Sequence, residues 1–348
     1  MNPNLGSPQN PFNFYQKAGY NFFQVLDHFL TRRVTIKLFG KLRYFHFKSL
    51  LAALEKKGEG VLYKVDQREQ LTEAEFKNEY LKKGLPVIIK NAAKDWDCVK
   101  NWSPNYFQNL HGDDKISLFD GKNPSGGVQY TNLFDLIERI KKGDKKAYFR
   151  AYNLLHRHPE HYRDFDMNWI KGLSHKRKYF DSFQVFIGPK DSETELHNSH
   201  LANLFIQVYG KKEWILYPNF DVPFIDPPST LNGIYRNSPS RANGQPFNPF
   251  HPDHEGYPYF KYLDGYRLTL EPGDILYNPP FMWHVVRNET DSIGVGYRWI
   301  NALHSFKASP VYYLLDLMAY RPNYFKTIKR VKVDGNNQFI DKYGEKKA

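Results

Sequence analysis

The sequence predicts a mixed but β-rich fold, an antiparallel barrel or jelly roll with helices flanking it at both ends. Aromatic residues make up 17% of the 348 residues, and 23 Gly with 22 Pro supply frequent turns. This composition favours many short strands. Apolar segments separated by turn residues then follow one another in the second half of the chain, at 182–188, 203–218, 267–280 and 284–300.

The N-terminal part, residues 1–58, is predicted to be a basic helical extension. Its apolar residues recur at helical spacing in 22–30, and the segment 47–58 has the pattern of a helix that ends at Gly58. Basic side chains are dense between Arg32 and Lys48. We expect this extension to pack on the main domain, or to present an aromatic and cationic surface to a membrane or an acidic partner.

The main domain, residues 59–308, is predicted to begin with alternating helices and strands. Thr72 and Glu75 form a capping-box pattern at the start of a helix, and an apolar strand follows at 86–91. A second helix at 134–144 leads into a strand at 146–154.

Two further segments complete the predicted organisation. Residues 219–262 are rich in Pro, Asn, Gly, His and Tyr without periodicity, which is typical of a functional lid or a disordered loop. In the C-terminal segment 309–348, Val311, Leu314, Leu315 and Met318 lie at the spacing of a helix with one apolar face.

Cysteine content and hydropathy restrict the class of protein. A single cysteine, Cys98, excludes an internal disulfide framework and zinc sites built on cysteine. The N-terminus lacks the pattern of a secretory signal, and no apolar run reaches the roughly 20 residues that span a bilayer. We therefore expect a soluble, cytoplasmic protein, whose net charge of +12 allows an acidic partner.

The stretch "TELHNSH", residues 194–200, predicts a metal site of unusual composition. Side chains at alternate strand positions share a face, so His197 and position 199 can lie together, and His284 can reach them from a distant strand. Two histidines with a carboxylate hold iron(II) and leave open positions for ligands. Here Ser199 stands where the carboxylate is expected.

Three stretches together resemble the Jumonji-C or cupin-like family of iron(II)- and 2-oxoglutarate-dependent oxygenases, in particular the branch with the asparaginyl hydroxylase of hypoxia-inducible factor. They are "EFKNEYLKKGLPVIIKNAAKDW", "TELHNSHLANLFIQVYGKKEWILYP" and "PGDILYNPPFMWHVVRN". The resemblance extends over roughly residues 65–305 and implies a double-stranded β-helix, the jelly roll of cupins.

The resemblance also implies roles for individual residues. His197 and His284 match the iron-binding histidines, and Lys212 matches the lysine that pairs with the far carboxylate of 2-oxoglutarate. The remaining matched positions are those of residues that bind the same cosubstrate, Tyr148, Thr194 and Asn203. A cation with hydroxyl donors is what a buried dianion requires.

The sequence departs from the family pattern at two positions. Ser199 replaces the Asp or Glu ligand, and Gly296 replaces an asparagine that is frequent on the last strand of the barrel. A serine hydroxyl is neutral and binds iron(II) poorly. Glu195, which shares strand parity with His197, and His200 are alternative sources of a ligand.

Three functions are compatible with this pattern. The first is an oxygenase that hydroxylates a protein side chain or a small molecule at the variant site. The second is a halogenase, because a small residue such as Ser199 leaves room for chloride on the metal. The third is a catalytically inactive cupin-like binding module. The C-terminal helix resembles the dimerisation element of the family, so a homodimer is expected.

Overall fold

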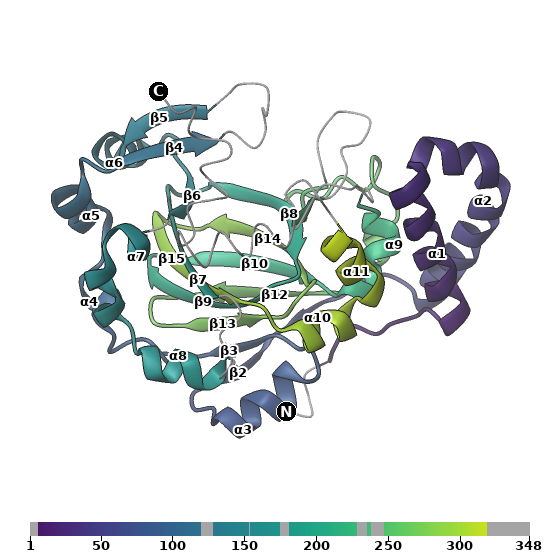
Figure 1. Ribbon diagram of the computed structural model, residues 1–348, viewed down its shortest axis with the longest axis horizontal. Helices are drawn as coiled ribbons and strands as arrows, with labels where there is room; N and C mark the ends of the chain where they lie inside the picture. The colour runs from purple at the N-terminus through teal and green to yellow at the C-terminus, as the bar shows by residue number, and fades with distance from the viewer. Residues whose placement is uncertain are drawn as a thin grey trace.

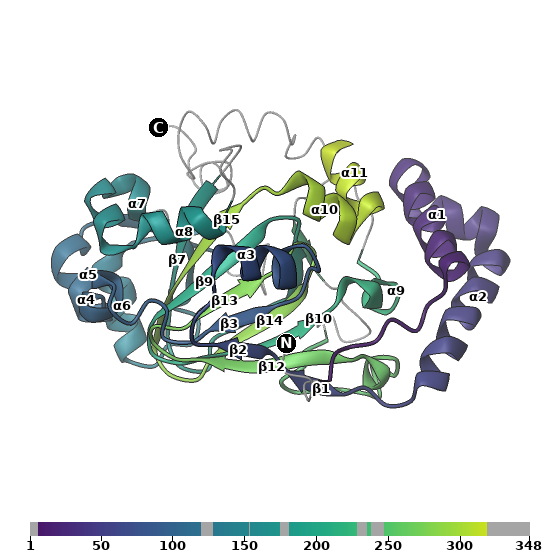
Figure 2. The ribbon, with the colours of Figure 1, turned by 90° about the horizontal axis from the view of Figure 1, so that it is seen from below.

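Two β-sheets packed face to face form the centre of the protein (Figures 1 and 2). The computed structural model describes residues 6–119, 128–152, 154–174, 181–227, 235–237 and 247–318. In these ranges one sheet contains, in spatial order, β1 (Leu62–Lys64), β12 (Gly265–Leu270), β10 (Lys212–Tyr217), β14 (Trp283–Asn288), β8 (Glu193–Ser199) and β11 (Tyr235–Asn237).

The second sheet lies opposite the first and is joined at its edge by a short hairpin in Figure 1. Its strands are β2 (Asp66–Arg68), β3 (Val87–Ile89), β13 (Ile275–Asn278), β9 (Ala202–Tyr209), β15 (Ser292–Trp299), β7 (Asp181–Gly188) and β6 (Phe149–Tyr152). The hairpin consists of β4 (Lys115–Phe119) and β5 (Val128–Asn132). The predicted jelly-roll class with flanking helices is thereby confirmed.

Helices cover the outer faces of both sheets. On the second sheet these are α3 (Glu73–Glu75), η1 (Phe76–Leu81), α4 (Asp97–Asn101), α5 (Pro104–His111), α6 (Leu133–Lys141), α7 (Leu154–Arg157), η3 (Pro159–Asp164) and α8 (Met167–Leu173). On the first they are α1 (Phe14–Leu30), α2 (Arg32–Lys57), η4 (Asn219–Asp221), α9 (Val222–Ile225), η5 (Phe260–Tyr262), α10 (Ala302–Ala308) and α11 (Pro310–Met318).

Strand β9 shows why the central strands are almost entirely apolar. Its residues alternate between two cores: Phe205 packs between the sheets, whereas Leu204 and Ile206 pack against the outer helices. A strand buried on both faces favours hydrophobic residues at most positions, and in β9 the buried polar exceptions are Asn203 and Gln207. The long apolar runs of the sequence are the consequence.

The N-terminal extension forms a helical hairpin of α1 and α2 beside the first sheet (Figure 1). It is attached through a hydrogen bond between the hydroxyls of Tyr20 and Tyr312 (3.0 Å) and through stacking of Phe12 on Phe224. Helix α2 ends at Gly58, as predicted. In the described part of the chain, no helix has the length and apolarity required to cross a membrane.

Two local predictions need correction. The helix expected after Thr72 keeps its capping box, but from Phe76 it continues as a π-helix, because backbone bonds such as Lys82 N–H to Lys77 O span five residues. In α11 the predicted apolar face is only partly buried: Leu315 is buried, whereas Leu314 and Met318 are 48% and 47% accessible. The buried face also contains Tyr312 and Asp316.

Candidate metal and cosubstrate site

The two predicted metal-binding histidines meet on neighbouring antiparallel strands of the first sheet. His197 on β8 is the Cα partner of His284 on β14, and their ring centroids lie 4.1 Å apart. Each Nδ1 lies within hydrogen-bond distance of a backbone carbonyl, Glu195 O at 2.7 Å and Met282 O at 2.9 Å. If each Nδ1 carries the proton that it donates, each Nε2 keeps a lone pair for a metal.

Burial keeps both imidazoles neutral. It lowers the pKa of His197 to about 4, and nearby Arg298 and Arg150 act in the same direction. Burial, the neighbouring His197 and Arg298 lower the pKa of His284 well below its ordinary value. The neutral form is the one that binds metal ions, so the pair is ready for a metal at neutral pH.

A β-bulge in β8 brings Thr194 to the same face as His197. Between the partners His197–His284 and Thr194–Val286 the register shifts, with one extra residue on β8. The Thr194 hydroxyl accepts a hydrogen bond from Val286 N–H at 3.0 Å. The bulge breaks the regular alternation from which a shared face of Glu195 and His197 was expected, and Glu195 contacts the His197 ring through its backbone carbonyl.

Ser199 closes strand β8 beside the histidine pair. Its hydroxyl accepts a hydrogen bond from Leu201 N–H at 3.2 Å, and its carbonyl accepts one from Phe281 N–H at 2.7 Å. The side chain is buried. It supplies a turn and a small neutral group at the position where the sequence pattern leads one to expect a carboxylate.

No acidic side chain joins the two histidines to complete a three-residue metal group in the described ranges. His200, considered as a ligand, is buried with its Nδ1 3.5 Å from Asp316 Oδ2 of α11. A separate group of potential metal ligands, His111, Glu160 and His161, lies on helices beside the other sheet.

Lys212 lies at the start of β10 and is 1% exposed. Its ammonium donates a hydrogen bond to Asn288 Oδ1, and it forms no ion pair with a carboxylate of the described residues. Burial lowers its pKa to about 7, and Arg150 contributes to the shift. The nitrogen lies 5.6 Å from the ring centroid of Tyr148, so the structure brings these two predicted residues together.

Asn203 occupies the space beside Gly296. A Cβ atom at position 296 would lie 3.1 Å from Asn203 Oδ1, which leaves little room for a larger residue while Asn203 keeps this position. Asn203 is buried, and its Oδ1 has no hydrogen-bond partner among the residues described. Such an atom is costly unless a ligand or water satisfies it.

Three contributing residues are absent from the sequence prediction. Asn288 orients Lys212 and is held by donating to Ser192 Oγ at 2.8 Å. Trp214 stacks on His284 with ring centroids 5.6 Å apart, and Arg298 is a buried cation near both histidines. Strand parity offered one signal, because Asn288 lies four residues after His284 and therefore on the same face.

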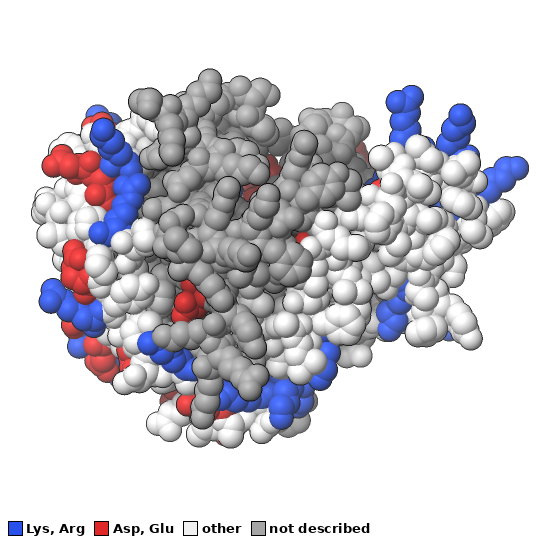
Figure 3. Space-filling model, viewed as in Figure 1, with Lys and Arg blue, Asp and Glu red and all other residues white. Residues whose placement is uncertain are grey.

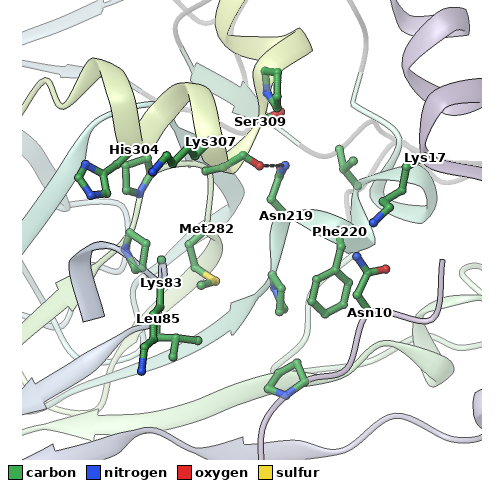
Figure 4. Close-up of a pocket in the computed structure, with 18 of the residues that line it drawn as sticks. Asn10, Lys17, Lys83, Leu85, Asn219, Phe220, Met282, His304, Lys307 and Ser309 are labelled. Carbon is green, nitrogen blue, oxygen red and sulfur yellow. Dashed lines mark hydrogen bonds between the residues drawn. The ribbon is translucent and has the colours of Figure 1, made fainter. Parts of the chain in front are cut away.

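A groove of about 550 Å³ lies near, but not at, the histidine pair (Figure 4). Lys17, Lys83 and Lys307 make part of its lining basic. Met282 connects the two places: its side chain lines the groove, while its carbonyl binds His284 Nδ1.

Comparison with known proteins places this site in a family. The model of the cupin-like domain matches residues 73–304. JmjC domain-containing protein D of Dictyostelium discoideum is 27% identical over 245 residues, which cover 64% of this chain and 53% of that protein. The human bifunctional peptidase and (3S)-lysyl hydroxylase JMJD7 is 24% identical over 275 residues, which cover 70% and 86%.

A plant relative is matched over a similar share of this chain. Lysine-specific demethylase JMJ30 of Arabidopsis thaliana is 25% identical over 254 residues, covering 70% of this chain and 56% of that protein. Several of these relatives are thus matched over little more than half their length. With its paired histidines inside a jelly roll, the chain belongs to the cupin-like domain family and is similar to JmjC domain-containing proteins.

Proposed function

We propose that this protein is an iron(II)- and 2-oxoglutarate-dependent oxygenase that hydroxylates a protein side chain. The observation that carries the proposal is buried Lys212, which has no carboxylate partner in the described part of the chain. An isolated ammonium inside a barrel is costly. A bound dianion of the size of 2-oxoglutarate would remove that cost.

The residues present would supply two of the three protein ligands that iron(II) usually has in such sites. His197 and His284 would bind through Nε2, while Ser199 supplies space for water or an anion in the third position. When bound, iron(II) with 2-oxoglutarate supplies the oxygen activation that a protein side chain cannot. The hydrogen bond from each Nδ1 to a backbone carbonyl would fix the orientation of the ring for metal binding.

The cosubstrate residues fit a dianion. Lys212 would form the ion pair with the far carboxylate, and the hydroxyls of Tyr148 and Thr194 would donate hydrogen bonds. The unsatisfied Oδ1 of Asn203 marks a further polar contact in the cavity. Nearby, β11 pairs with β8 so that Tyr235 lies opposite Ser199. Residues 219–262 thus contribute a strand at the metal site, where substrate would lie.

The relatives support a protein side chain as substrate. One is named a lysyl hydroxylase and others lysine-specific demethylases. A small molecule remains the alternative substrate class for this chain. The two are separated by mass spectrometry of peptide libraries incubated with the loaded protein.

Anaerobic titration with iron(II) and 2-oxoglutarate tests the proposal. We expect a visible charge-transfer band at one equivalent of each. Lys212→Met should abolish the band, whereas Lys211→Met should keep it, because Lys211 is an exposed turn residue paired with Glu271. A folded wild-type protein that gives no band and retains no metal would instead be an inactive cupin-like binding module.

A halogenase is the second candidate, supported by the charge around the metal position. Ser199 leaves room for chloride, and Arg298 and Arg150 create a positive potential that acts on His197. Halogenated product that depends on chloride would support it. Ser199→Asp should then shift the product to hydroxylation and tighten iron binding about tenfold or more, since a carboxylate is a far better ligand than a hydroxyl. Hydroxylated product at every chloride concentration would exclude it.

A further inference from the structure

A second cluster of histidines lies far from the jelly-roll site. His111 is the last residue of α5. His158 directly precedes η3 and His161 lies within it, on the helical side of the second sheet. Figure 1 shows α5 and the neighbouring α7 apart from β8 and β14. The cluster therefore shares no residue with the proposed oxygenase centre.

The cluster brings together three side chains that can bind a metal ion. His111 Nε2 and His161 Nε2 are 2.7 Å apart, and one ring nitrogen of each histidine lies within 4.8 Å of a carboxylate oxygen of Glu160. Both imidazoles are buried, while Glu160 is exposed. Two ring nitrogens and one carboxylate oxygen converge from segments about 50 residues apart in sequence.

A surrounding carboxylate sets the tautomer of His161. Asp164 Oδ2 lies 2.6 Å from His161 Nδ1 and also accepts a hydrogen bond from Trp102 Nε1 at 2.9 Å. A histidine that donates Nδ1–H to a carboxylate directs a basic Nε2 at its partner, the arrangement that supports metal ligands in proteins. Burial, with His158 and His161, lowers the pKa of His111 to about 4, which keeps its ring neutral.

We propose that His111, His161 and Glu160 bind a zinc ion. Zinc prefers this combination of imidazole and carboxylate in a tetrahedral arrangement. A rotation of the two rings that widens the 2.7 Å separation would admit the ion, with water in the fourth position. The ion would join α5 to η3 and so stabilise the helical layer.

Zinc content measured in a protein without the oxygenase ligands tests this proposal. In His197→Ala/His284→Ala, we expect one equivalent of zinc to be retained after dialysis and to raise the melting temperature. His111→Ala or His161→Ala added to that background should lose it. The matched control is His156→Ala, an exposed histidine of α7.

Cobalt substitution gives a readout that loss of folding does not mimic. Cobalt(II) in a tetrahedral site should give intense visible bands in the background protein and weak or no bands in His161→Gln of unchanged circular dichroism. A folded background protein that binds no zinc, or a His111→Ala variant that binds it equally well, would overturn the proposal. The cluster would then be a hydrogen-bonded pair within the core.

The α1–α2 hairpin supports a second, independent proposal. Many large apolar side chains are exposed on it: Phe14, Tyr15, Phe22, Phe29, Leu30, Val34, Ile36, Leu38, Leu42, Tyr44 and Phe45. Contiguous exposed apolar surface of this kind marks an interaction site.

The charge of the hairpin is almost exclusively positive. Asp27 is the only acidic residue before Glu55, and it is buried in ion pairs with Arg32 and Arg43. Exposed cations alternate with the apolar residues along α2: Arg33, Lys37 and Lys41 each precede an exposed apolar residue. Figure 3 shows Lys and Arg side chains projecting from this end of the molecule.

We propose that this hairpin docks on an anionic lipid surface. Aromatic and aliphatic side chains would enter the interface, and lysines would contact acidic headgroups. Neither helix is long and apolar enough to cross a bilayer, so the hairpin would lie in the plane of the membrane. The excess of cations argues against pairing with the same face of a second copy.

Cosedimentation of the full chain with vesicles tests this docking. Binding is expected to vesicles of phosphatidylcholine with 30% phosphatidylserine, to weaken with salt, and to be absent with phosphatidylcholine alone. Lys37→Glu/Lys41→Glu and Leu38→Ser/Phe45→Ser should each reduce binding at least tenfold, while the control Lys77→Glu/Lys100→Glu should not. Equal sedimentation with and without vesicles, or concentration-dependent self-association lost in Leu38→Ser/Phe45→Ser, would overturn it.

Discussion

Adjacent lysines at the start of β10 show how environment decides the role of a residue. Lys211 is exposed and pairs with Glu271 at 2.6 Å, whereas Lys212 is buried against Asn288. The sequence "GKK" does not distinguish them; strand pairing does, because Lys212 is the Cα partner of Asn288 on β14. One residue of register separates a surface cation from a buried one.

The lowered pKa of Lys212 predicts how cosubstrate affinity depends on pH. Its pKa is about 7 without an anion, and a bound dianion favours the charged form. Below pH 7 the ammonium is already charged and affinity should be flat; above pH 7 binding requires proton uptake, so affinity should fall by up to about tenfold per pH unit. The histidines stay neutral throughout this range. Calorimetry of 2-oxoglutarate binding between pH 6 and 9 measures the slope, and a flat profile would contradict it.

Thr194 gives a second prediction at this scale. Its hydroxyl accepts from Val286 N–H at the bulge, and under the proposed function it would donate to the cosubstrate. Thr194→Val leaves that buried N–H without a partner and should cost about 1–3 kcal/mol in the free energy of unfolding. It should also weaken 2-oxoglutarate binding, while Thr194→Ser keeps both properties. Denaturant unfolding measures the stability of each variant, and titration with 2-oxoglutarate measures its binding. Equal stability of Thr194→Val and Thr194→Ser would refute the role of the hydroxyl.

At the scale of elements, the bulge in β8 determines which side chains face the metal position. Regular alternation would place Thr194 and His197 on opposite faces. The extra residue between them restores a common face. Sequence patterns do not mark such bulges, so strict alternation could not place Thr194 relative to His197.

The hairpin of α1 and α2 depends on one buried carboxylate. Arg32 joins Asp27 in α1 to Asp226 beyond α9, at 2.9 Å and 2.7 Å. Arg32→Ala removes both links and should lower stability by about 1–2 kcal/mol, an amount moderated by the partial exposure of the guanidinium. Arg33→Ala, at an exposed neighbouring position, should change it by less than about 0.5 kcal/mol. Hydrogen exchange of the α1 and α2 amides locates the effect, and equal results for the two variants would contradict this account.

For the whole molecule, the sandwich explains why few sequence signals point to the site directly. Three cores hold the layers together, one between the sheets and one on each outer face. The site lies where strands from the first sheet meet residues of the second, so Tyr148 of the β6 region reaches Lys212 of β10. Such contacts depend on how the sheets face each other.

Assembly of two copies stays a prediction at this scale. Leu314 and Met318 of α11 and Leu303 of α10 are exposed apolar residues at the C-terminal end of the described chain. If the protein is a homodimer through this end, Leu314→Glu should shift it to monomer in analytical ultracentrifugation, because a buried carboxylate opposes association. Leu110→Glu, at an exposed leucine of α5, is the control. A monomeric wild-type protein would refute the expected dimer.

Local patterns sufficed for the fold class, most helix limits and the histidine pair. Apolar alternation, caps such as Thr72 and the terminal Gly58 act within a few residues, and the quoted motifs carried the family resemblance. The tertiary structure alone decided that Lys212 is buried without a carboxylate partner in the described ranges, that the bulge turns Thr194 inward, and that His111 meets His161. These properties arise from contacts between segments distant in sequence, and register and burial exist only after those segments have packed.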